Sequence, residues 1–178
     1  ALPIWDLGSS NEKYRNGSVK ELQRVVDLTK SLLPYFGKAE RPLVIVSVGG
    51  FTEHQPLALD QRYALYQRVA QSLSELDSKD VEILPQTLPP FPWYFGGQRF
   101  KIGRAHAWTP VRCCTEFAQR VCLHLSHSAL TCNERRTDFR DFVRQVGPYT
   151  GHLHIGDAGG VDGEGLQIGD GDIDFAGL

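Results

Sequence analysis

The sequence predicts an α/β fold built on a parallel sheet, and three observations support this prediction. Short apolar runs rich in β-branched residues occur at 43–48, 81–84, 121–125 and 152–155. Runs of this kind are typical of strands buried on both faces, as in parallel sheets. Segments with helical periodicity separate the strands, and clusters of His and Asp follow the last two runs. Strand and helix alternation implies right-handed crossovers, so these polar groups would meet at the carboxyl ends of parallel strands.

The first element that we expect is a helix beginning at Ser18. Ser18 and Glu21 have the spacing of a capping box, in which each residue's side chain bonds the other's free amide. Pro34 and Gly37 are expected to end the helix. The side chains of one buried stripe recur between these limits at Leu22, Val25, Val26, Thr29, Leu32 and Leu33.

The remaining elements follow in the same alternation. The strand at 43–48 is closed by Gly49 and Gly50, and the next helix presents an apolar face made of Tyr66, Val69, Ala70, Leu73 and Leu76. The strand at 81–84 runs into Pro85, Gln86 and Thr87. Between the last two strands we expect a helix capped by Thr137, whose inner face is Phe139, Phe142, Val143 and Val146. Residues 4–7 have the pattern of the end of a fifth strand.

The composition suits one globular domain. The chain has 178 residues, of which 41% are apolar and 22% charged, and its formal net charge is −2. No run approaches 18 apolar residues, so we expect no membrane partner, and the near-neutral charge argues against a nucleic-acid partner. No secretory pattern is visible, and the four cysteines form no C-x-x-C pair. We therefore expect a reduced, cytoplasmic protein in which Cys122 is a small buried side chain of its strand.

The length restricts the architecture. A closed eight-stranded barrel needs about 250 residues, so the chain is expected to be either an open sheet or a fragment of a barrel. The segment 101–111 lacks helical periodicity at a point where a barrel needs a helix. It also resembles the translation of a common sequencing-library adaptor, and we interpret 101–113 as foreign sequence.

Several motifs resemble the xylose-isomerase-like TIM-barrel superfamily, which includes sugar-phosphate isomerases and epimerases and endonuclease IV. The motifs lie at 121–128, 152–158 and 163–175, and the segment 85–98 is similar to a branch associated with sialic-acid-synthase-type proteins. The resemblance implies a partial (β/α)8 TIM barrel in which parallel strands alternate with helices. Residues 1–178 would form a single incomplete domain, a fragment that lacks the first strands and the closing segment.

The resemblance also implies a divalent metal (Mn, Zn, Co or Mg) held by Glu, Asp, His and Glu at the strand ends. His154 matches the histidine ligand of the seventh strand, and His127 matches a histidine three residues beyond the sixth-strand ligand. The sixth-strand position, usually Asp, is His124 here. The fifth-strand position, usually Glu, is Gln86, and the eighth-strand Glu would lie beyond Leu178.

The residues themselves indicate the same region. Neutral imidazole is a ligand for Zn, Mn, Fe or Co, and we expect His154, His127 and His124 to hold the metal. If the strand ends after His124, a loop would turn His127 back toward this centre; His124 alternatively packs inside the barrel. Asp157 would contact the metal or orient His154, or else it caps the following loop.

Four further residues are candidates for substrate binding. Asp162 and Glu164 lie in the glycine-rich loop 159–165, where the backbone can approach a ligand closely, although a solvated turn is the alternative. Gln86 would hydrogen-bond a hydroxyl group. Trp93 belongs to the proline-rich aromatic loop 89–95, which would stack on a sugar ring or dock on a partner subunit.

The leading hypothesis is a metal-dependent sugar or sugar-phosphate isomerase or epimerase that transfers a proton on a carbohydrate. The alternative is a non-catalytic sugar-binding or assembly module that accompanies a sialic-acid-type synthase as a partner domain. Gln86 and His124 favour this alternative, whereas the histidine cluster favours the enzyme. A phosphodiesterase similar to endonuclease IV ranks last, because it needs a fuller ligand set and a basic surface.

Overall fold

Four parallel strands form the centre of the fold. The computed structural model describes residues 5–37, 41–49, 58–90, 93–94, 98–99 and 120–178, so the interpretation of 101–113 lies outside the described residues. β1 (Leu43–Val46) pairs in parallel with β2 (Glu82–Pro85), and β5 (Val121–His124) pairs in parallel with β6 (Thr150–His154). A parallel bridge between Gln86 and Cys122 joins the two pairs. The parallel α/β prediction is therefore confirmed for the described residues.

The strands present alternate side chains to two faces. Val44, Val46 and Val48 on or just after β1 pack into the core shared with the helices α1 (Glu12–Ser31) and α2 (Leu59–Ser74). Successive side chains of a strand point to opposite faces, so Ile45 and Ser47 face the other side of the sheet. The predicted strands agree with the observed ones to within two residues at each end, which is the usual uncertainty of element boundaries.

The first helix begins earlier than the capping box predicts. α1 spans Glu12–Ser31, and the side chain of Asn11 caps it by accepting the Tyr14 N–H at 3.1 Å. Ser18 lies inside the helix, where its hydroxyl donates to the Tyr14 carbonyl and accepts the Asp6 N–H. The prediction that the helix starts at Ser18 was wrong. The Ser18 hydroxyl bonds backbone groups that precede it in the chain instead of capping the amides that follow it. The end of the helix was predicted correctly: the 3-10 turn η1 (Leu33–Tyr35) follows, and Gly37 has φ +62°.

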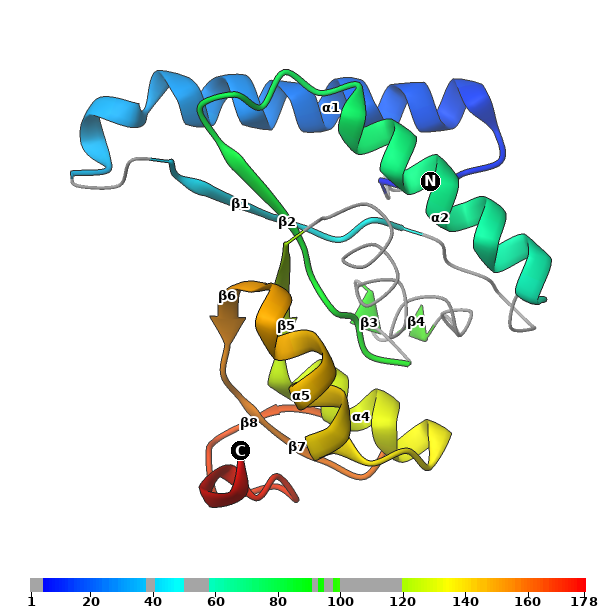
Figure 1. Cartoon of the computed structure of the whole chain (residues 1–178), viewed down its shortest axis with the longest axis vertical. Helices are drawn as coiled ribbons and strands as arrows, with labels where there is room; N and C mark the ends of the chain where they lie inside the picture. Colours follow the sequence, from blue (N-terminus) through cyan, green and yellow to red (C-terminus); the bar gives the residue numbers. More distant parts are fainter. Residues whose placement is uncertain (1–4, 38–40, 50–57, 91–92, 95–97, 100–119) are drawn as a thin grey trace.

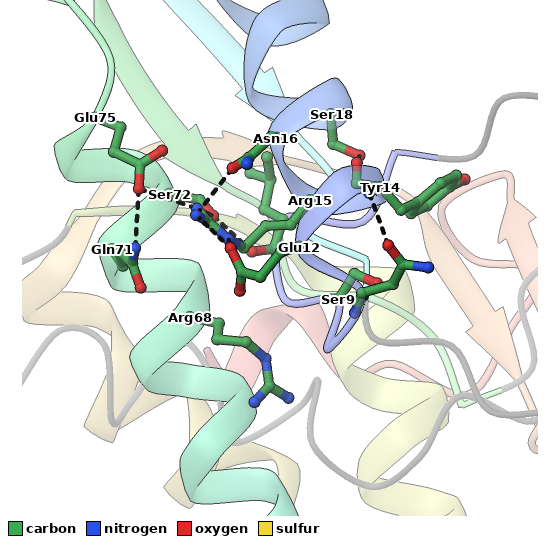
Figure 2. A network of polar contacts seen from close by, with 12 residues as sticks. Ser9, Glu12, Tyr14, Arg15, Asn16, Ser18, Arg68, Gln71, Ser72 and Glu75 are labelled. Atoms are coloured by element: carbon green, nitrogen blue, oxygen red, sulfur yellow. Dashed lines mark hydrogen bonds and ion pairs between the residues drawn. The ribbon is translucent and has the colours of Figure 1, made fainter.

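A buried arginine joins α1 to α2 (Leu59–Ser74). The side chain of Arg15 is 3% exposed, and its guanidinium contacts Ser72 of the neighbouring helix, Glu75 just after that helix, and Glu12 of its own helix. Figure 2 shows this side chain extending from α1 toward α2. The Ser72 hydroxyl in turn donates to the Leu7 carbonyl at 2.7 Å. These bonds fix the segment before α1 against both helices.

A second core lies under α4 (Leu125–Arg135) and α5 (Phe139–Val146). Val121 and Leu123 of β5 pack there against Phe142 and Val146, which confirms the inner face predicted for α5. Asp138, not Thr137, caps α5, because its carboxylate accepts the Asp141 N–H at 2.8 Å. Figure 1 shows α1 and α2 beside β1 and β2, whereas α4 and α5 accompany β5 and β6.

The other elements are short. β3 (Trp93–Tyr94) pairs with β4 (Gln98–Arg99), and β7 (Asp157–Gly159) pairs with β8 (Gly163–Leu166), both antiparallel. The 3-10 turns η2 (Gly147–Tyr149) and η3 (Phe175–Gly177) complete the fold. Residues 5–7 form no strand, although the Leu7 N–H donates to the Val48 carbonyl at 3.0 Å. None of the helices in the described ranges is long and apolar enough to span a membrane.

Candidate functional site

Two histidines meet at the carboxyl ends of β5 and β6. His124 is the last residue of β5 and His154 the last residue of β6, and the parallel register places them opposite one another. Their ring centroids are 5.1 Å apart, with perpendicular planes. The sequence prediction that neighbouring strands bring these two imidazoles together is therefore confirmed.

His127 joins this pair from a helix instead of a loop. α4 begins immediately after β5, with His124 as its N-cap residue, so His127 lies in the first turn. Its ring stacks on His124 with centroids 3.5 Å apart and planes 5° from parallel. The predicted loop between the two histidines was wrong. The helical turn nevertheless brings both rings to the same place, as the motif had indicated.

Both ring nitrogens of His127 have hydrogen-bond partners. Nδ1 lies 2.8 Å from the carbonyl oxygen of Thr87, and Nε2 lies 2.8 Å from Oε1 of Glu164. A carbonyl oxygen only accepts, so Nδ1 must carry a hydrogen. The short contact at Nε2 requires a second proton between His127 and the Glu164 carboxyl group. The pair therefore holds one proton more than a neutral imidazole facing a carboxylate.

Glu164 reaches this proton from β8. Its side chain is 33% exposed, so it connects the buried histidine to solvent. The hydrogen bond from His127 lowers the pKa of the Glu164 carboxyl group, and the positive charge of the imidazole acts in the same direction against the effect of burial. The lowered pKa favours the ionised form of the Glu164 carboxyl group.

The two other rings of the cluster favour their neutral forms. Burial, reinforced by the charges of His127 and His154, lowers the pKa of His124 to about 4. Burial also lowers the pKa of His154, together with the nearby His152 and His127. Nδ1 of His124 is buried and has no hydrogen-bond partner among the described residues. A buried polar atom of this kind marks a position for water or for a ligand group.

Asp157 contacts the backbone that follows it. Its carboxylate is fully buried and accepts the N–H groups of Ala158, Gly169, Gly171 and Ile173 at 2.8–3.1 Å. Burial raises its pKa, but the four N–H donors outweigh burial and lower the pKa overall. Both of its oxygens accept amide groups of residues 158–173. This is the arrangement expected if Asp157 caps the backbone that follows it instead of binding a metal.

The other predicted substrate residues lie around the cluster. Gln86 is half-buried in the bridge with Cys122, immediately before Thr87. Asp162 is exposed in the turn before β8, where its carbonyl accepts the Glu164 N–H. The backbone of Trp93 pairs with that of Arg99. Its side chain lies outside what the structure describes.

Two residues of the site had no signal in the sequence. Thr87 follows the end of β2, is fully buried, and contacts His127 and His124. The Ser126 hydroxyl accepts the Gly165 N–H at 3.0 Å and holds the backbone next to Glu164 against α4. In a sequence, a small hydroxyl residue beside a motif looks the same whether or not it hydrogen-bonds the residues of that motif. Only the folded structure shows which hydroxyl residues do so.

The candidate metal ligands do not fit a resident divalent ion as they are arranged. Within the described ranges, no group of three or more His, Cys, Asp or Glu side chains could hold a metal ion. The ring nitrogens of His127 and the oxygens of Asp157 already have hydrogen-bond partners. His124 and His154 remain, and two imidazoles are fewer than the three protein ligands typical of a catalytic zinc.

Comparison with known proteins identifies the wider group. A family model described as xylose isomerase-like TIM barrel matches residues 1–178. The chain is also similar to a solved D-tagatose 3-epimerase-like protein, with 19% identity and a TM-score of 0.67. The match covers 99% of this chain and 61% of that one. For an L-ribulose 3-epimerase the identity is 16% and the TM-score 0.64, with 97% of this chain and 52% of that one covered. A D-allulose 3-epimerase from Methylomonas sp., solved with D-allulose, has 17% identity and a TM-score of 0.56, with 97% and 54% covered.

The chain thus spans between 52% and 61% of the length of these structures. At such identities the likeness concerns the fold, which is an α/β domain matching part of a TIM barrel. No curated protein sequence matches the chain.

Proposed function

Because the chain belongs to the xylose isomerase-like TIM-barrel family, we propose that it is a sugar or sugar-phosphate isomerase or epimerase that transfers a proton on its substrate. The observation that carries this proposal is the His127–Glu164 pair, in which Nε2 of a buried imidazole lies 2.8 Å from Oε1 of a partly exposed carboxyl group. Catalytic groups of parallel barrels lie at the carboxyl ends of the strands, and this pair lies beside β5 and β6.

The pair has the two groups that a carbonyl-directed proton transfer needs. A sugar that enters between them would receive the Nε2 hydrogen bond of His127 on its carbonyl oxygen. Glu164, released from that bond, would take a proton from the adjacent carbon, while the carbonyl oxygen takes the proton of His127 to give an enediol. In the second half, the Glu164 carboxyl group returns its proton to the former carbonyl carbon while the other enediol hydroxyl gives its proton to His127. A new carbonyl forms, both groups regain their starting states, and an aldose–ketose isomerisation is complete with one carboxylate. Epimerisation requires a second proton donor on the opposite face.

The remaining residues have supporting roles in this proposal. His124 Nδ1, which is buried and unpaired among the described residues, would receive a hydroxyl group of the sugar. His154 and Gln86 would line the same rim, and Asp162 and Trp93 would approach the sugar from the loops. Asp157 accepts four N–H groups of the segment 158–173, which includes β8 and therefore Glu164.

The proposal makes a prediction about whether the activity needs a divalent metal. The family resemblance of the sequence motifs implies a divalent metal, and such an ion would polarise a sugar carbonyl. Any Mn, Zn, Co or Mg that used His127 or Glu164 would have to replace the proton between them. The activity is therefore expected to persist in a chelating buffer.

The test is conversion of ketohexoses, beginning with D-tagatose and D-allulose, by the purified protein with and without chelator. Glu164→Gln keeps the shape of the side chain but cannot take a proton, and we expect it to lower kcat by roughly 100-fold or more. Glu21→Gln, an exposed position on α1, is the matched control and should equal the wild type. Turnover that depends strictly on added metal, or an active Glu164→Gln protein, would contradict the proposed roles.

The second candidate is a non-catalytic sugar-binding or assembly module beside a sialic-acid-type synthase. Two observations favour it. The neutral Gln86 stands where the family resemblance implies a carboxylate, and within the described ranges no group of three or more His, Cys, Asp or Glu side chains could hold a metal ion. Saturable sugar binding by calorimetry without any conversion would favour this candidate over the enzyme.

A further inference from the structure

Thr87 contacts several parts of the candidate site at once. It follows β2 and is fully buried, and its backbone N–H donates to the Cys122 carbonyl of β5 at 3.1 Å. Its own carbonyl accepts from His127 Nδ1 at 2.8 Å. One residue thus connects the end of β2 with β5 and with the first turn of α4.

The hydroxyl group of Thr87 has no remaining bonding capacity. It accepts the His124 N–H at 2.9 Å and the Ser128 hydroxyl at 3.0 Å, and it donates to the His124 carbonyl at 3.3 Å. A hydroxyl has one donor and two acceptor positions, and all three are used here. The Thr87 hydroxyl is therefore not available to contact substrate. It holds His124, which ends β5 and caps α4, in place.

The carbonyl of Thr87 decides which nitrogen of His127 carries the first hydrogen. Because it only accepts, the ring is held with Nδ1 protonated and Nε2 directed at Glu164. If the ring turned or exchanged tautomers, a carbonyl would face a lone pair, which is repulsive in a buried site. The proton between His127 and Glu164 thus depends on how firmly this carbonyl is placed.

We propose that Thr87 is a positioning residue, which fixes the ring orientation and tautomer of His127 so that the His127–Glu164 pair can carry and deliver a proton. This inference rests on the proposed function for the delivery of the proton to a sugar. The arrangement of the ring stands independently of it.

The inference predicts different effects for two substitutions at one position. Thr87→Ser keeps the hydroxyl and should behave like the wild type. Thr87→Val keeps the shape but removes all three hydroxyl bonds, so the β5–α4 junction and the carbonyl lose their fixed positions. Thr131→Val is the matched control: its hydroxyl donates to the Leu88 carbonyl at 3.1 Å, one turn further along α4, and it does not contact His127.

The test is ¹⁵N NMR of the histidine rings, with the His127 signals assigned by their loss in His127→Asn. In the wild type, Thr87→Ser and Thr131→Val, we expect a protonated Nδ1 on His127. In Thr87→Val we expect a mixture of tautomers, with kcat lower by roughly 10- to 100-fold and KM little changed. A wild-type His127 whose Nδ1 lacks a hydrogen would overturn the inference, even if Thr87→Val does not fold.

The outcomes separate the two proposals. If Thr87→Val retains both the tautomer and the kcat of the wild type, the positioning role is wrong, while the proposed function stands. If the tautomer changes in Thr87→Val as expected but the wild type converts no sugar, the proposed function fails, while the role of Thr87 in orienting His127 stands.

Discussion

Single residues at this site differ sharply in how much the sequence could predict about them. His124, His127 and His154 were expected to converge, because they follow or end neighbouring strands of a parallel sheet. The partnership of His127 with Glu164 was not predictable, since 37 residues separate them. It depends on a loop path through Gly160 and Gly165, which have φ of +58° and +68°.

His124 makes the stability of the protein depend on pH. Its pKa lies near 4 in the folded state, against an ordinary value of 6.5. As the pH falls below 6.5 the unfolded chain binds a proton that the folded site refuses, so the free energy of unfolding decreases until about pH 4. From the size of the shift, about 3 kcal/mol is lost across this window.

We expect His124→Asn to remove most of this loss. Urea denaturation between pH 7 and 4 would measure it, with His152→Asn as control, because the His152 side chain is exposed. Parallel pH profiles for the wild type and His124→Asn would show that His124 is not the group responsible.

At the scale of elements, local patterns predicted the amphipathic helices better than the buried ones. The inner faces of α2 and α5 were predicted from their periodicity and are confirmed. The helix α4 was missed as a separate element, and in the structure its residues 125–132 are all buried, polar side chains included. The start of α1 was misplaced because the capping-box spacing at Ser18 lies inside the helix, whose N-cap is Asn11.

The contact between α1 and α2 depends on Arg15. Arg15→Met retains the apolar stem but leaves Ser72 and Glu75 without their partner, and we expect the free energy of unfolding to fall by about 2–4 kcal/mol. Arg24→Met is the control, because the Arg24–Glu21 pair is exposed and such pairs contribute about 0–1 kcal/mol. Equal losses in the two variants, measured by chemical denaturation, would contradict this assignment.

The loop 158–173 depends on Asp157. Asp157→Asn replaces one accepting oxygen by an NH₂ group that faces N–H donors, so the loop should open more often. We expect hydrogen exchange at Gly169, Gly171 and Ile173 to be at least about tenfold faster, while α1 is unchanged. Asp170→Asn, at an exposed position in the same loop, is the matched control. Unchanged exchange in Asp157→Asn would mean that the loop is held by other contacts.

At the scale of the whole molecule, the order of strands followed from the alternation of elements in the sequence. Successive strands joined by helices usually lie side by side in a parallel sheet, and β1, β2, β5 and β6 are arranged in this way. The chemistry of the rim was not predictable to the same extent. The type of each residue was visible, but whether an imidazole faces a metal, a carbonyl or a carboxylate depends on tertiary contacts such as those of Thr87.

The central claim is that the Glu164 carboxylate removes and returns the proton on the carbon beside the substrate carbonyl. Incubation of the protein with a ketohexose in D₂O and chelator measures this directly, because the ¹H NMR signal of the carbon beside the carbonyl disappears as deuterium replaces its proton. We predict deuterium incorporation by the wild type and by Glu21→Gln, and none above background by Glu164→Gln. Equal incorporation by Glu164→Gln and the wild type would contradict the account.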